Sequence, residues 1–409
     1  MKKYAIFGNP VIHSKSPHIF NSLFEEWGQS NIYKRVRINE AQEIIAVFDQ
    51  YDLSGANITS PFKETILPFL DKVDNVSKEI NSVNTVIKKG DHFYGFNTDV
   101  YGVENAIINN GLNVKNKKCI VLGAGGAAKA AIYALNNLGA LTQSVNRTDS
   151  KSLKISRYFN CKHILFEKLE ENLKDTYLII IAIKNMDIDL SKKIKDTIVL
   201  NANYNSDKYE DRSSRIIDGH DWLISQASKA FEIFFDKIPN QLSMKRSLNN
   251  IERKPSNIAL IGMSGVGKTF YGKIISEKLN KTYLDVDELV EKKAEISIMD
   301  IFRDFGEERF RDYEKEVLGE LSSLENTVIA LGAGAILSQD IRKILSENYF
   351  VVHLHVDIQE LVNMFLNKES SIENRPLLRK KYLRQDIENL FKNRKEYYFT
   401  LSDLTIYLN

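Results

Sequence analysis

The stretch that decides the fold of the C-terminal part is Gly262-Met-Ser-Gly-Val-Gly-Lys-Thr269. It fits the pattern G-x-x-x-x-G-K-[ST], and it stands between an apolar run (258–261) and a helical pattern (270–279). Strand, glycine-rich loop and helix are the context in which backbone N–H groups cradle phosphates. We expect Gly265 and Gly267 to approach the phosphates of ATP, Lys268 to reach the β- and γ-phosphates, and the Thr269 hydroxyl to ligate Mg²⁺.

Short apolar runs alternate with helical patterns on both sides of residue 250. Examples of the runs are Cys119-Ile-Val-Leu122, Leu178-Ile-Ile-Ile181 and Val328-Ile-Ala-Leu331, and a helical pattern covers 127–138. Strand, helix and strand in succession are typical of parallel sheets with crossover helices. The sequence therefore predicts the α/β class, built from two or three units.

Length and composition exclude several classes of protein. The 409 residues suffice for two or three domains, and 56 basic against 54 acidic side chains leave a net charge of +2. Such a charge attracts neither nucleic acid nor an anionic membrane. Two cysteines cannot form a disulfide framework, and the longest apolar run, 177–183, is far shorter than the ~20 residues that span a bilayer. We predict a cytoplasmic protein.

Three features beyond the phosphate loop indicate which substrate receives the phosphoryl group. Asp285-Val-Asp287 ends an expected strand, Phe310-Arg311-Asp-Tyr-Glu314 lies in an expected helix, and Gly332-Ala-Gly334 follows another strand. Taken alone, Asp285 and Asp287 are explained equally well by a solvated turn and a helix cap. Surface ion pairing alone is the simpler explanation for Arg309 and Arg311.

Taken in order with Arg375-Pro-Leu-Leu378 and Arg394, these motifs resemble the shikimate kinase family over residues 257–409. The resemblance implies that Asp287 holds the ring hydroxyls of shikimate and acts as the base, and that Asp285 supports Mg²⁺ through water. It further implies that Arg311 and Arg394 bind the substrate carboxylate, because a planar guanidinium binds a carboxylate with two hydrogen bonds.

The same resemblance assigns Gly334 to the substrate and places Arg375 on a lid, where its charge would neutralise the transferred phosphoryl group. Two residues depart from the family pattern. Ala333 replaces the middle glycine of the turn, and Glu396 replaces a proline after Arg394. We expect Ala333 to affect substrate affinity more than the reaction.

A second glycine-rich turn lies in the first half. Gly123-Ala-Gly-Gly-Ala-Ala128 follows an apolar run and matches the dinucleotide pattern G-x-G-x-x-[GA]. An NAD site carries an acid about 20 residues further on, whereas this chain has Asn146-Arg-Thr148 there. A guanidinium suits a 2′-phosphate, so the cofactor is predicted to be NADP(H). The predicted contacts are Gly123, Gly125, Gly126, Ala127, Asn146, Arg147 and Thr148.

Polar clusters follow apolar runs in the first 100 residues. They include His13-Ser-Lys-Ser-Pro17, Pro61-Phe-Lys63, Val83-Asn-Thr85 and Asn97-Thr-Asp99. A lysine beside an aspartate in a cleft can exchange a proton during carbonyl reduction and stabilise the alkoxide. These residue types are also common in turns and helix caps, which alone is the simpler explanation.

The order of these clusters, with the glycine-rich turn, resembles the shikimate dehydrogenase family over about residues 1–250. The resemblance implies that Lys63 and Asp99 carry the proton transfer. It assigns Ser14 and Ser16 to the substrate carboxylate. Ring hydroxyls would be held by Thr59, Asn84, Asp99 and Gln226.

Departures from this family cluster near the expected nicotinamide end. Val100 and Asp221 replace glycines, and Ala182-Ile-Lys-Asn185 replaces the motif N-A-T-S. We expect Asp221 to bring bulk and negative charge there, so that hydride transfer suffers more than substrate binding.

The sequence thus predicts a bifunctional enzyme. A dehydrogenase substrate domain would span 1–100 with about 226–248, a Rossmann domain 101–225, a linker 249–256 and a P-loop kinase with a parallel sheet 257–409. The first half would reduce 3-dehydroshikimate to shikimate with NADPH, and the second would phosphorylate shikimate with MgATP. Two alternatives remain open: a kinase fused to a shikimate sensor without redox turnover, and a kinase for another alcohol fused to a quinate-type dehydrogenase.

Overall fold

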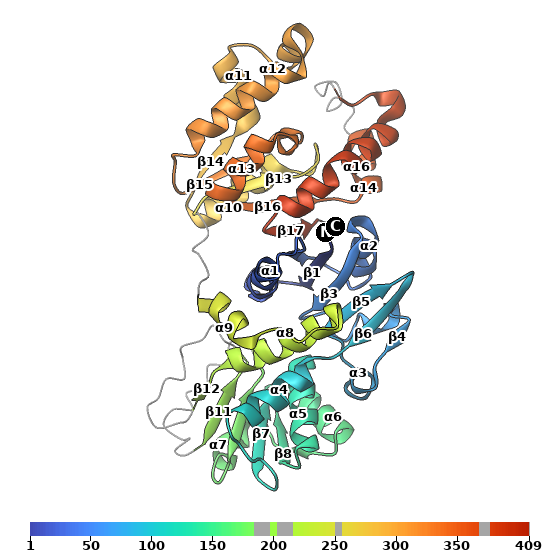
Figure 1. Ribbon diagram of the computed structural model, residues 1–409, viewed down its shortest axis with the longest axis vertical. Coiled ribbons are helices and arrows are strands. Elements are labelled where there is room, and N and C mark those ends of the chain that lie inside the picture. The colour runs from blue at the N-terminus through green and yellow to red at the C-terminus, as the bar shows by residue number, and fades with distance from the viewer. Residues whose placement is uncertain (184–196, 203–215, 250–255, 368–376, 409) are drawn as a thin grey trace. The chain divides into compact units, whose positions relative to one another are not determined.

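A computed structural model describes residues 1–183, 197–202, 216–249, 256–367 and 377–408 (Figure 1). Contacts within the chain group it into two compact units. The first comprises residues 1–4, 15–31 and 53–250, and the second comprises residues 5–14, 32–52 and 251–409. Each unit is described by itself below.

The first unit contains a six-stranded sheet with all neighbouring strands parallel, in the order β12-β11-β10-β7-β8-β9. The strands are β7 (Lys118–Leu122), β8 (Leu141–Val145), β9 (Lys162–His163), β10 (Leu178–Ile181), β11 (Ile198–Asn201) and β12 (Ile216–Ile217). Numbered from β7, this is the doubly wound order of dinucleotide-binding domains, with the switch point between β7 and β10. The predicted Rossmann fold is confirmed.

Both faces of this sheet are buried, as a central parallel sheet requires. Cys119 and Val121 of β7 pack into one apolar cluster, and Ile120 and Leu122 pack into another on the opposite face. The helices are α4 (Asp99–Asn109), α5 (Gly126–Asn137), α6 (Asp149–Tyr158), α7 (Leu169–Asn172) and the short η2 (Phe166–Lys168).

A second set of strands in the first unit carries the polar clusters of the first 100 residues. Here β3 (Leu53–Ile58), β5 (Thr85–Lys89), β6 (His92–Phe96) and β4 (Lys72–Val73) are neighbours in that order. Packed with them are α1 (Ser16–Glu26), η1 (Leu67–Phe69), α3 (Asn75–Ile80), α8 (Gly219–Phe235) and α9 (Gln241–Asn249). Phenylalanine rings join α1 and α8: the Phe20 and Phe231 ring centroids, for example, are 6.0 Å apart.

The second unit is built on parallel strands in the order β14-β15-β13-β16-β17-β2, with β1 next. The strands are β1 (Lys3–Gly8), β2 (Ile32–Arg37), β13 (Ile258–Ile261), β14 (Thr282–Asp285), β15 (Thr327–Ala330), β16 (Phe350–His355) and β17 (Leu404–Tyr407). The helices are α2 (Gln42–Tyr51), α10 (Lys268–Leu279), α11 (Val286–Ala294), α12 (Ile298–Leu321), η3 (Ala335–Leu337), α13 (Gln339–Asn348), α14 (Ile358–Leu366), η4 (Lys380–Tyr382) and α16 (Leu383–Leu401). The predicted α/β class with a parallel kinase sheet is confirmed.

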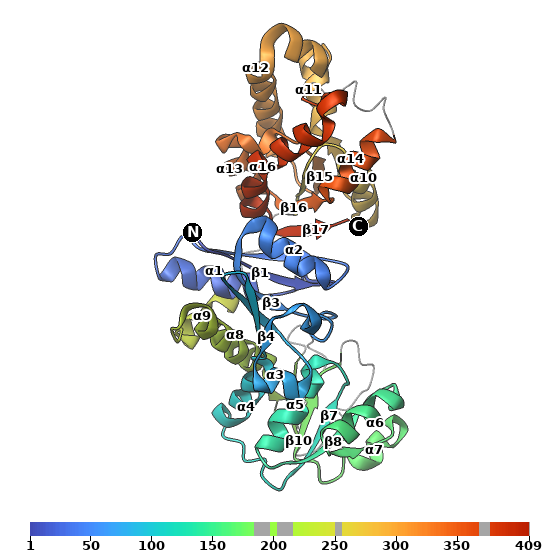
Figure 2. The same ribbon diagram turned by 90° about the vertical axis from the view of Figure 1, so that its right-hand side faces the viewer.

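Two local features refine the sequence analysis. α11 and α12 lie side by side (Figure 2), and α12 is interrupted at Gly306, whose φ of 82° is left-handed. α9 extends to residue 249, so the first residue of the predicted linker is helical. The helix holds because Met244 and Leu248, one turn apart, bury their side chains. Residues 250–255 of the predicted linker lie outside the described part of the chain.

Candidate active sites

Lys63 and Asp99 meet in the first unit. Lys63 Nζ lies 2.6 Å from Asp99 Oδ2, and the two side chains are only 15% and 9% exposed. Lys63 stands in the segment after β3, and Asp99 begins α4. A charged, nearly buried amine held by one carboxylate can deliver a proton and stabilise a developing alkoxide.

Asn97 fixes the backbone at Asp99, a role that the sequence analysis missed. Its Oδ1 accepts hydrogen bonds from the backbone N–H groups of Asp99 (3.0 Å) and Val100 (3.2 Å), and its Nδ2 donates to the Ser82 carbonyl (2.9 Å). The recognisable signal is an asparagine two residues before a helix, because an asparagine side chain often binds backbone N–H groups two or three residues further on.

A second polar group joins three segments. Asn84 Nδ2 donates to Thr98 Oγ1 (3.0 Å) and to Gln226 Oε1 (3.5 Å), and Thr98 Oγ1 lies 3.3 Å from Gln226 Oε1. The structure thus brings together Asn84 and Gln226, which are 142 residues apart in the chain. Thr98 is an additional member that the sequence analysis did not assign.

The remaining predicted substrate contacts occupy loop ends. Ser14 and Ser16 are 6% and 4% exposed, and Ser16 is the first residue of α1. Ser14 belongs to the second compact unit, whereas Ser16 belongs to the first. Thr59 directly follows β3 and is half-buried.

The glycine-rich turn lies against Lys63. A Cβ built on Gly126 would stand 2.7 Å from Ser82 Oγ and 3.1 Å from Lys63 Cδ, so a side chain here would displace the lysine. At Gly125 a Cβ would meet open space, which leaves room for a pyrophosphate over the backbone. The first unit therefore places the candidate cofactor turn and the proton-transfer pair together.

Asn146, Arg147 and Thr148 follow β8, beside the turn that follows β7. Asn146 Nδ2 donates to the Thr148 carbonyl (3.1 Å), and Arg147 is exposed. Parallel neighbours end at the same sheet edge, so Arg147 lies at the edge that also carries the glycine-rich turn.

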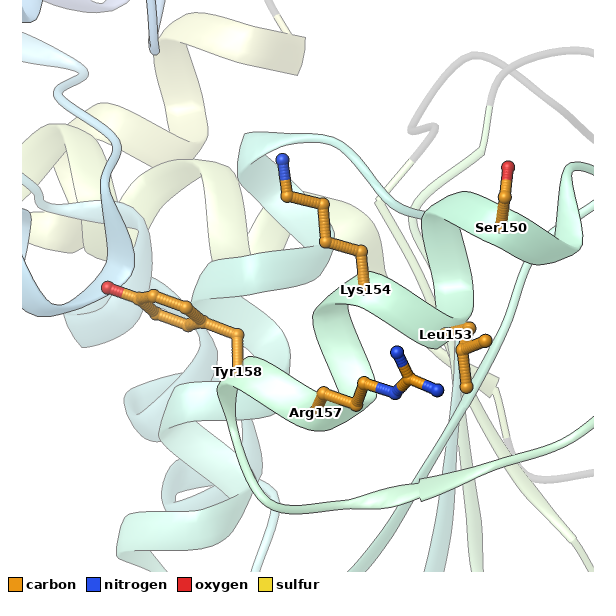
Figure 3. Close-up of a pocket in the computed structure, with 5 residues that line it drawn as sticks. All are labelled: Ser150, Leu153, Lys154, Arg157 and Tyr158. Carbon is orange, nitrogen blue, oxygen red and sulfur yellow. The ribbon is translucent and has the colours of Figure 1, made fainter.

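A shallow pocket lies nearby on α6 (Figure 3). Its lining residues are Ser150, Leu153, Lys154, Arg157 and Tyr158. All five belong to one helix, so the pocket has a single wall, and it contains none of the predicted contacts.

We expected Asp221 to bring an uncompensated negative charge, but its carboxylate has two hydrogen-bond donors. Its carboxylate accepts hydrogen bonds from Asn110 Nδ2 (2.9 Å) and Lys245 Nζ (2.6 Å). Burial opposes ionisation of Asp221, but the bonds from Lys245 and Asn110 lower its pKa. The expectation that this residue repels the cofactor is therefore not supported by its contacts. Val100, the other replaced glycine, is buried in the apolar cluster around β7.

Another chain of polar contacts involves residues to which the sequence analysis gave no role. Lys15 Nζ lies 2.9 Å from His220 Nε2, and His220 Nδ1 lies 2.8 Å from Asp218 Oδ1. Asp218 also caps α8 by accepting from the His220 backbone N–H. These contacts link Lys15, which lies between Ser14 and Ser16, to the start of α8, the helix that carries Gln226.

The phosphate loop of the second unit has the predicted form. Gly267 has a φ of +90°, and α10 begins at Lys268, whose Nζ donates to the carbonyls of Gly262 and Met263 (both 3.0 Å). A Cβ on Gly262 would stand 2.4 Å from the Leu354 carbonyl oxygen, so only glycine fits there. The backbone is thus shaped to approach a phosphate closely.

The residues predicted for Mg²⁺ are adjacent. Thr269 Oγ1 donates to Asp285 Oδ2 (2.9 Å), which also accepts from the Tyr283 hydroxyl (2.9 Å). A hydroxyl and a carboxylate at this distance fit Mg²⁺, which takes few protein oxygens and completes its shell with phosphate and water. Within the described ranges no cluster of three or more His, Cys, Asp or Glu side chains forms a metal site independent of nucleotide.

Asp287, Arg311 and Glu314 form the centre of the acceptor site. Arg311 Nη1 donates to Glu314 Oε2, and Nη2 donates to Glu307 Oε1 (2.8 Å). Burial raises the pKa of Asp287, an effect that Lys268 opposes, and burial raises the pKa of Glu314 to about 7. Glu314 is a further candidate site residue; it is the last residue of the pattern Phe310-Arg311-Asp-Tyr-Glu314, and the sequence analysis gave it no role.

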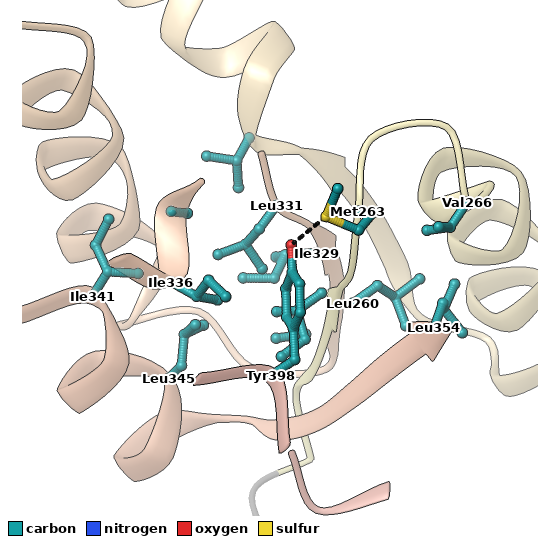
Figure 4. Packing of buried hydrophobic residues seen from close by; sticks show 14 of the residues in the cluster. Leu260, Met263, Val266, Ile329, Leu331, Ile336, Ile341, Leu345, Leu354 and Tyr398 are labelled. Carbon is teal, nitrogen blue, oxygen red and sulfur yellow. Dashed lines mark hydrogen bonds between the residues drawn. The ribbon is translucent and has the colours of Figure 1, made fainter. Parts of the chain in front are cut away.

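Glycines on the facing turn leave room for these side chains. A Cβ on Gly332 would stand 2.6 Å from Glu314 Oε1, and a Cβ on Gly334 would stand 2.1 Å from Arg311 Nη2. Both of these glycines are retained, and Ala333 lies between them. Its carbonyl accepts from the Tyr398 hydroxyl (2.8 Å), which also lies 3.9 Å from Met263 Sδ in the core (Figure 4).

Several buried polar atoms in this site lack a hydrogen-bond partner among the described residues. They are Asp287 Oδ1, Arg311 Nε, Glu314 Oε1 and Arg394 Nε. Arg394, 3% exposed on α16, interacts electrostatically with Tyr398, as does Arg311. Unsatisfied buried donors and acceptors are costly, so their concentration here indicates a site shaped for a polar ligand. Arg375 lies outside the described residues.

These features define the class: a dinucleotide-binding oxidoreductase domain and a P-loop kinase domain in one chain. Residues 6–86 match the family model of the shikimate dehydrogenase substrate binding domain, and residues 264–408 match that of shikimate kinase. A shikimate dehydrogenase (NADP(+)) of Aquifex aeolicus is 34% identical over 247 residues, which cover 56% of this chain and 90% of the relative. A Staphylococcus epidermidis shikimate dehydrogenase (NADP(+)) is 30% identical over 259 residues, which cover 59% of this chain and 96% of that relative.

Solved structures agree with these matches. The Aquifex aeolicus shikimate dehydrogenase gives a TM-score of 0.58 at 32% identity, covering 61% of this chain and 98% of that one. The Thermus thermophilus shikimate dehydrogenase, solved with NADP(H) and shikimate, gives a TM-score of 0.55 at 25% identity. The match covers 61% of this chain and 99% of that one. The chain belongs to the shikimate dehydrogenase family and carries a shikimate kinase domain, which makes it a bifunctional enzyme of the shikimate pathway.

Proposed function

We propose that the first half reduces 3-dehydroshikimate to shikimate with NADPH, and that the second half phosphorylates shikimate at its 3-hydroxyl with MgATP. The observation that carries the first assignment is the Lys63–Asp99 pair at 2.6 Å, held beside the cofactor turn at Gly126. A domain that only sensed shikimate would need no such pair, which favours redox turnover over the sensor alternative.

In the reduction, NADPH supplies a hydride to the carbonyl carbon. Lys63 donates a proton from its ammonium group to the carbonyl oxygen, and Asp99 keeps the lysine charged and oriented until then. Ser14 and Ser16 hold the carboxylate, while Thr59, Asn84 and Gln226 hold ring hydroxyls. The hydrogen bond between the Asn84 and Gln226 side chains supports a shared role for these two residues.

The cofactor is proposed to bind along the edge of the parallel sheet. Its pyrophosphate would lie over Gly123, Gly125, Gly126 and Ala127, at the start of α5, where free N–H groups attract anions. Its 2′-phosphate would accept hydrogen bonds from Arg147, flanked by Asn146 and Thr148.

In the phosphorylation, Asp287 is proposed to accept the proton of the attacking hydroxyl. Burial raises the pKa of Asp287, which makes its carboxylate a better proton acceptor than an exposed one. Arg311 and Arg394 would bind the carboxylate with the turn at Gly334, and Arg375 would neutralise the transferred group. Gly265, Gly267 and Lys268 would hold the ATP phosphates, and Thr269 with Asp285 would hold Mg²⁺.

The domain boundaries predicted above remain our proposal: substrate domain 1–100 with 226–248, Rossmann domain 101–225, linker 249–256 and kinase 257–409. No helix in the described ranges is long and apolar enough to cross a bilayer. We place the enzyme in the cytoplasm, acting on small molecules rather than nucleic acid, because its two cysteines are unpaired and its net charge is +2.

One incubation tests the assignment. The full chain is mixed with 3-dehydroshikimate, NADPH and MgATP, and shikimate and its phosphate are quantified over time. Sequential appearance of both products is expected. Phosphorylation of added shikimate without NADPH oxidation would establish the sensor alternative. In a separate assay with NADP⁺, faster oxidation of quinate than of shikimate would establish the quinate-type alternative.

A further inference from the structure

Arg35 on β2 holds the loop that carries Ser14. Its Nε and Nη2 both donate to the Ser14 carbonyl oxygen, at 3.0 and 2.6 Å, and the residue is 7% exposed. Arg37, on the same face of β2, donates from Nε to Asn9 Oδ1 (3.1 Å) at the other end of the loop. Arg35 thus fixes the Ser14 end of this segment, whereas Arg37 contacts only Asn9 at its far end.

The strand that supplies these arginines is paired by a strand of the kinase segment. In the second unit β17 runs parallel to β2, with Leu404 opposite Arg35 and Ile406 opposite Arg37. β2 lies within the residues that match the dehydrogenase model, and β17 lies within those that match the kinase model. Backbone hydrogen bonds therefore tie the position of Arg35 to the last strand of the kinase sheet.

Side chains of α16 reinforce this pairing. Lys395 Nζ donates to the Gln50 carbonyl (2.8 Å) at the C-terminal end of α2, where a positive charge stabilises the helix. Tyr51 and Phe399 stack with centroids 4.7 Å apart, and both are fully buried.

We propose that Arg35 is a positioning residue of the dehydrogenase reaction, and that β17 and α16 of the kinase segment hold it in place. The guanidinium sets the direction of the Ser14 backbone and so of its hydroxyl. The inference rests on the proposed role of Ser14. It follows that affinity of the first site for its substrate depends on residues of the second domain.

The test uses the full chain and two assays, NADPH oxidation with 3-dehydroshikimate and phosphorylation of added shikimate. Arg35→Met should raise KM for 3-dehydroshikimate about tenfold, because two charge-assisted hydrogen bonds are lost, and should change kcat less than about twofold. Arg35→Lys should recover most of the loss, since an ammonium can still donate to the Ser14 carbonyl. The matched control is Arg37→Met, which loses the same charge but not the Ser14 contact, and it should leave KM within about twofold.

The kinase side has its own matched pair. Lys395→Met should raise the same KM about threefold, while phosphorylation stays within about twofold. Lys392→Met, on the exposed face of α16 one turn earlier, should change neither activity.

An unchanged KM in folded Arg35→Met, or an equal rise in Arg37→Met, would overturn the inference. The inference would also be overturned if Lys395→Met and Lys392→Met had the same KM for 3-dehydroshikimate. If Arg35→Met did not fold, Arg35→Lys and Lys395→Met would carry the same comparison. Absence of NADPH oxidation in the unsubstituted chain would instead contradict the proposed function, and calorimetry of shikimate binding to the same variants would then test the positioning of Ser14 directly.

Discussion

Replacing Lys63 by methionine isolates the first reaction from everything else that the chain does. Methionine keeps the apolar stem and removes the ammonium that lies 2.6 Å from Asp99 Oδ2. Loss of a general acid lowers kcat by about 10²–10⁴, which corresponds to about 3–5 kcal/mol of activation free energy. Phosphorylation of added shikimate should be unchanged, because that chemistry uses Lys268 and Asp287.

The substitution also has a cost in stability, which a second variant separates from catalysis. Removing one partner of a buried ion pair destabilises by about 3–5 kcal/mol, and the true value should lie below this range because the two side chains keep 15% and 9% of their surface exposed. The double variant Lys63→Met/Asp99→Asn removes both charges, so its melting temperature should recover toward that of the unsubstituted chain. Its NADPH oxidation should stay lost.

Both activities are measured on one sample, with circular dichroism to establish that the variant is folded. NADPH oxidation by Lys63→Met within about tenfold of the original rate would refute the role of Lys63 as the acid. Loss of phosphorylation in a folded variant would refute the independence of the two sites.

Four further outcomes are expected. Lys268→Met should abolish phosphorylation and leave NADPH oxidation intact in the same paired assay. Arg147→Ala should weaken kcat/KM about tenfold or more for NADPH and little for NADH, because a charge-assisted hydrogen bond to the 2′-phosphate is lost; equal losses would contradict the assignment. Glu314 keeps its proton up to about pH 7 in the folded state but releases it near its ordinary pKa of 4.5 when unfolded. This group therefore lowers the free energy of unfolding as pH rises from about 4.5 to 7. Glu314→Gln should flatten that slope in urea titrations. Asp221→Gly should lower the free energy of unfolding by about 1 kcal/mol or less, since its partner Lys245 is half exposed, without raising kcat; a large gain in kcat would restore the expectation that Asp221 disturbs the cofactor.

The parts of the fold that could be predicted from the sequence are those encoded locally. The strand, glycine-rich loop and helix around Gly262–Thr269 and around Gly123–Ala128 follow from residue types within about 20 positions. The Lys63–Asp99 pair required the resemblance to a family, because no local rule places a lysine beside an aspartate 36 residues away.

What could not be predicted depends on contacts between distant segments. The sequence shows an unpaired aspartate at position 221, and only the fold reveals that Lys245 and Asn110 bind it. In the same way the pattern F-R-x-x-E contains Glu314, but its raised pKa follows from burial under a turn that lies about 20 residues further on. The pairing of β2 with β17 has no signal in either strand, because parallel partners are set by the packing of their neighbours.

The pairing of β2 with β17 imposes an order on biosynthesis. Leu404 leaves the ribosome 369 residues after Arg35, its partner in the sheet. At a synthesis rate of about 5–20 residues per second, the edge of β2 stays unpaired with β17 for about 20–70 s. An uncovered strand edge invites pairing with another chain, and charged side chains discourage it. Lys34, Arg35 and Arg37 place three positive charges on this strand, so β2 carries side chains of the kind that discourages such pairing before β17 is made.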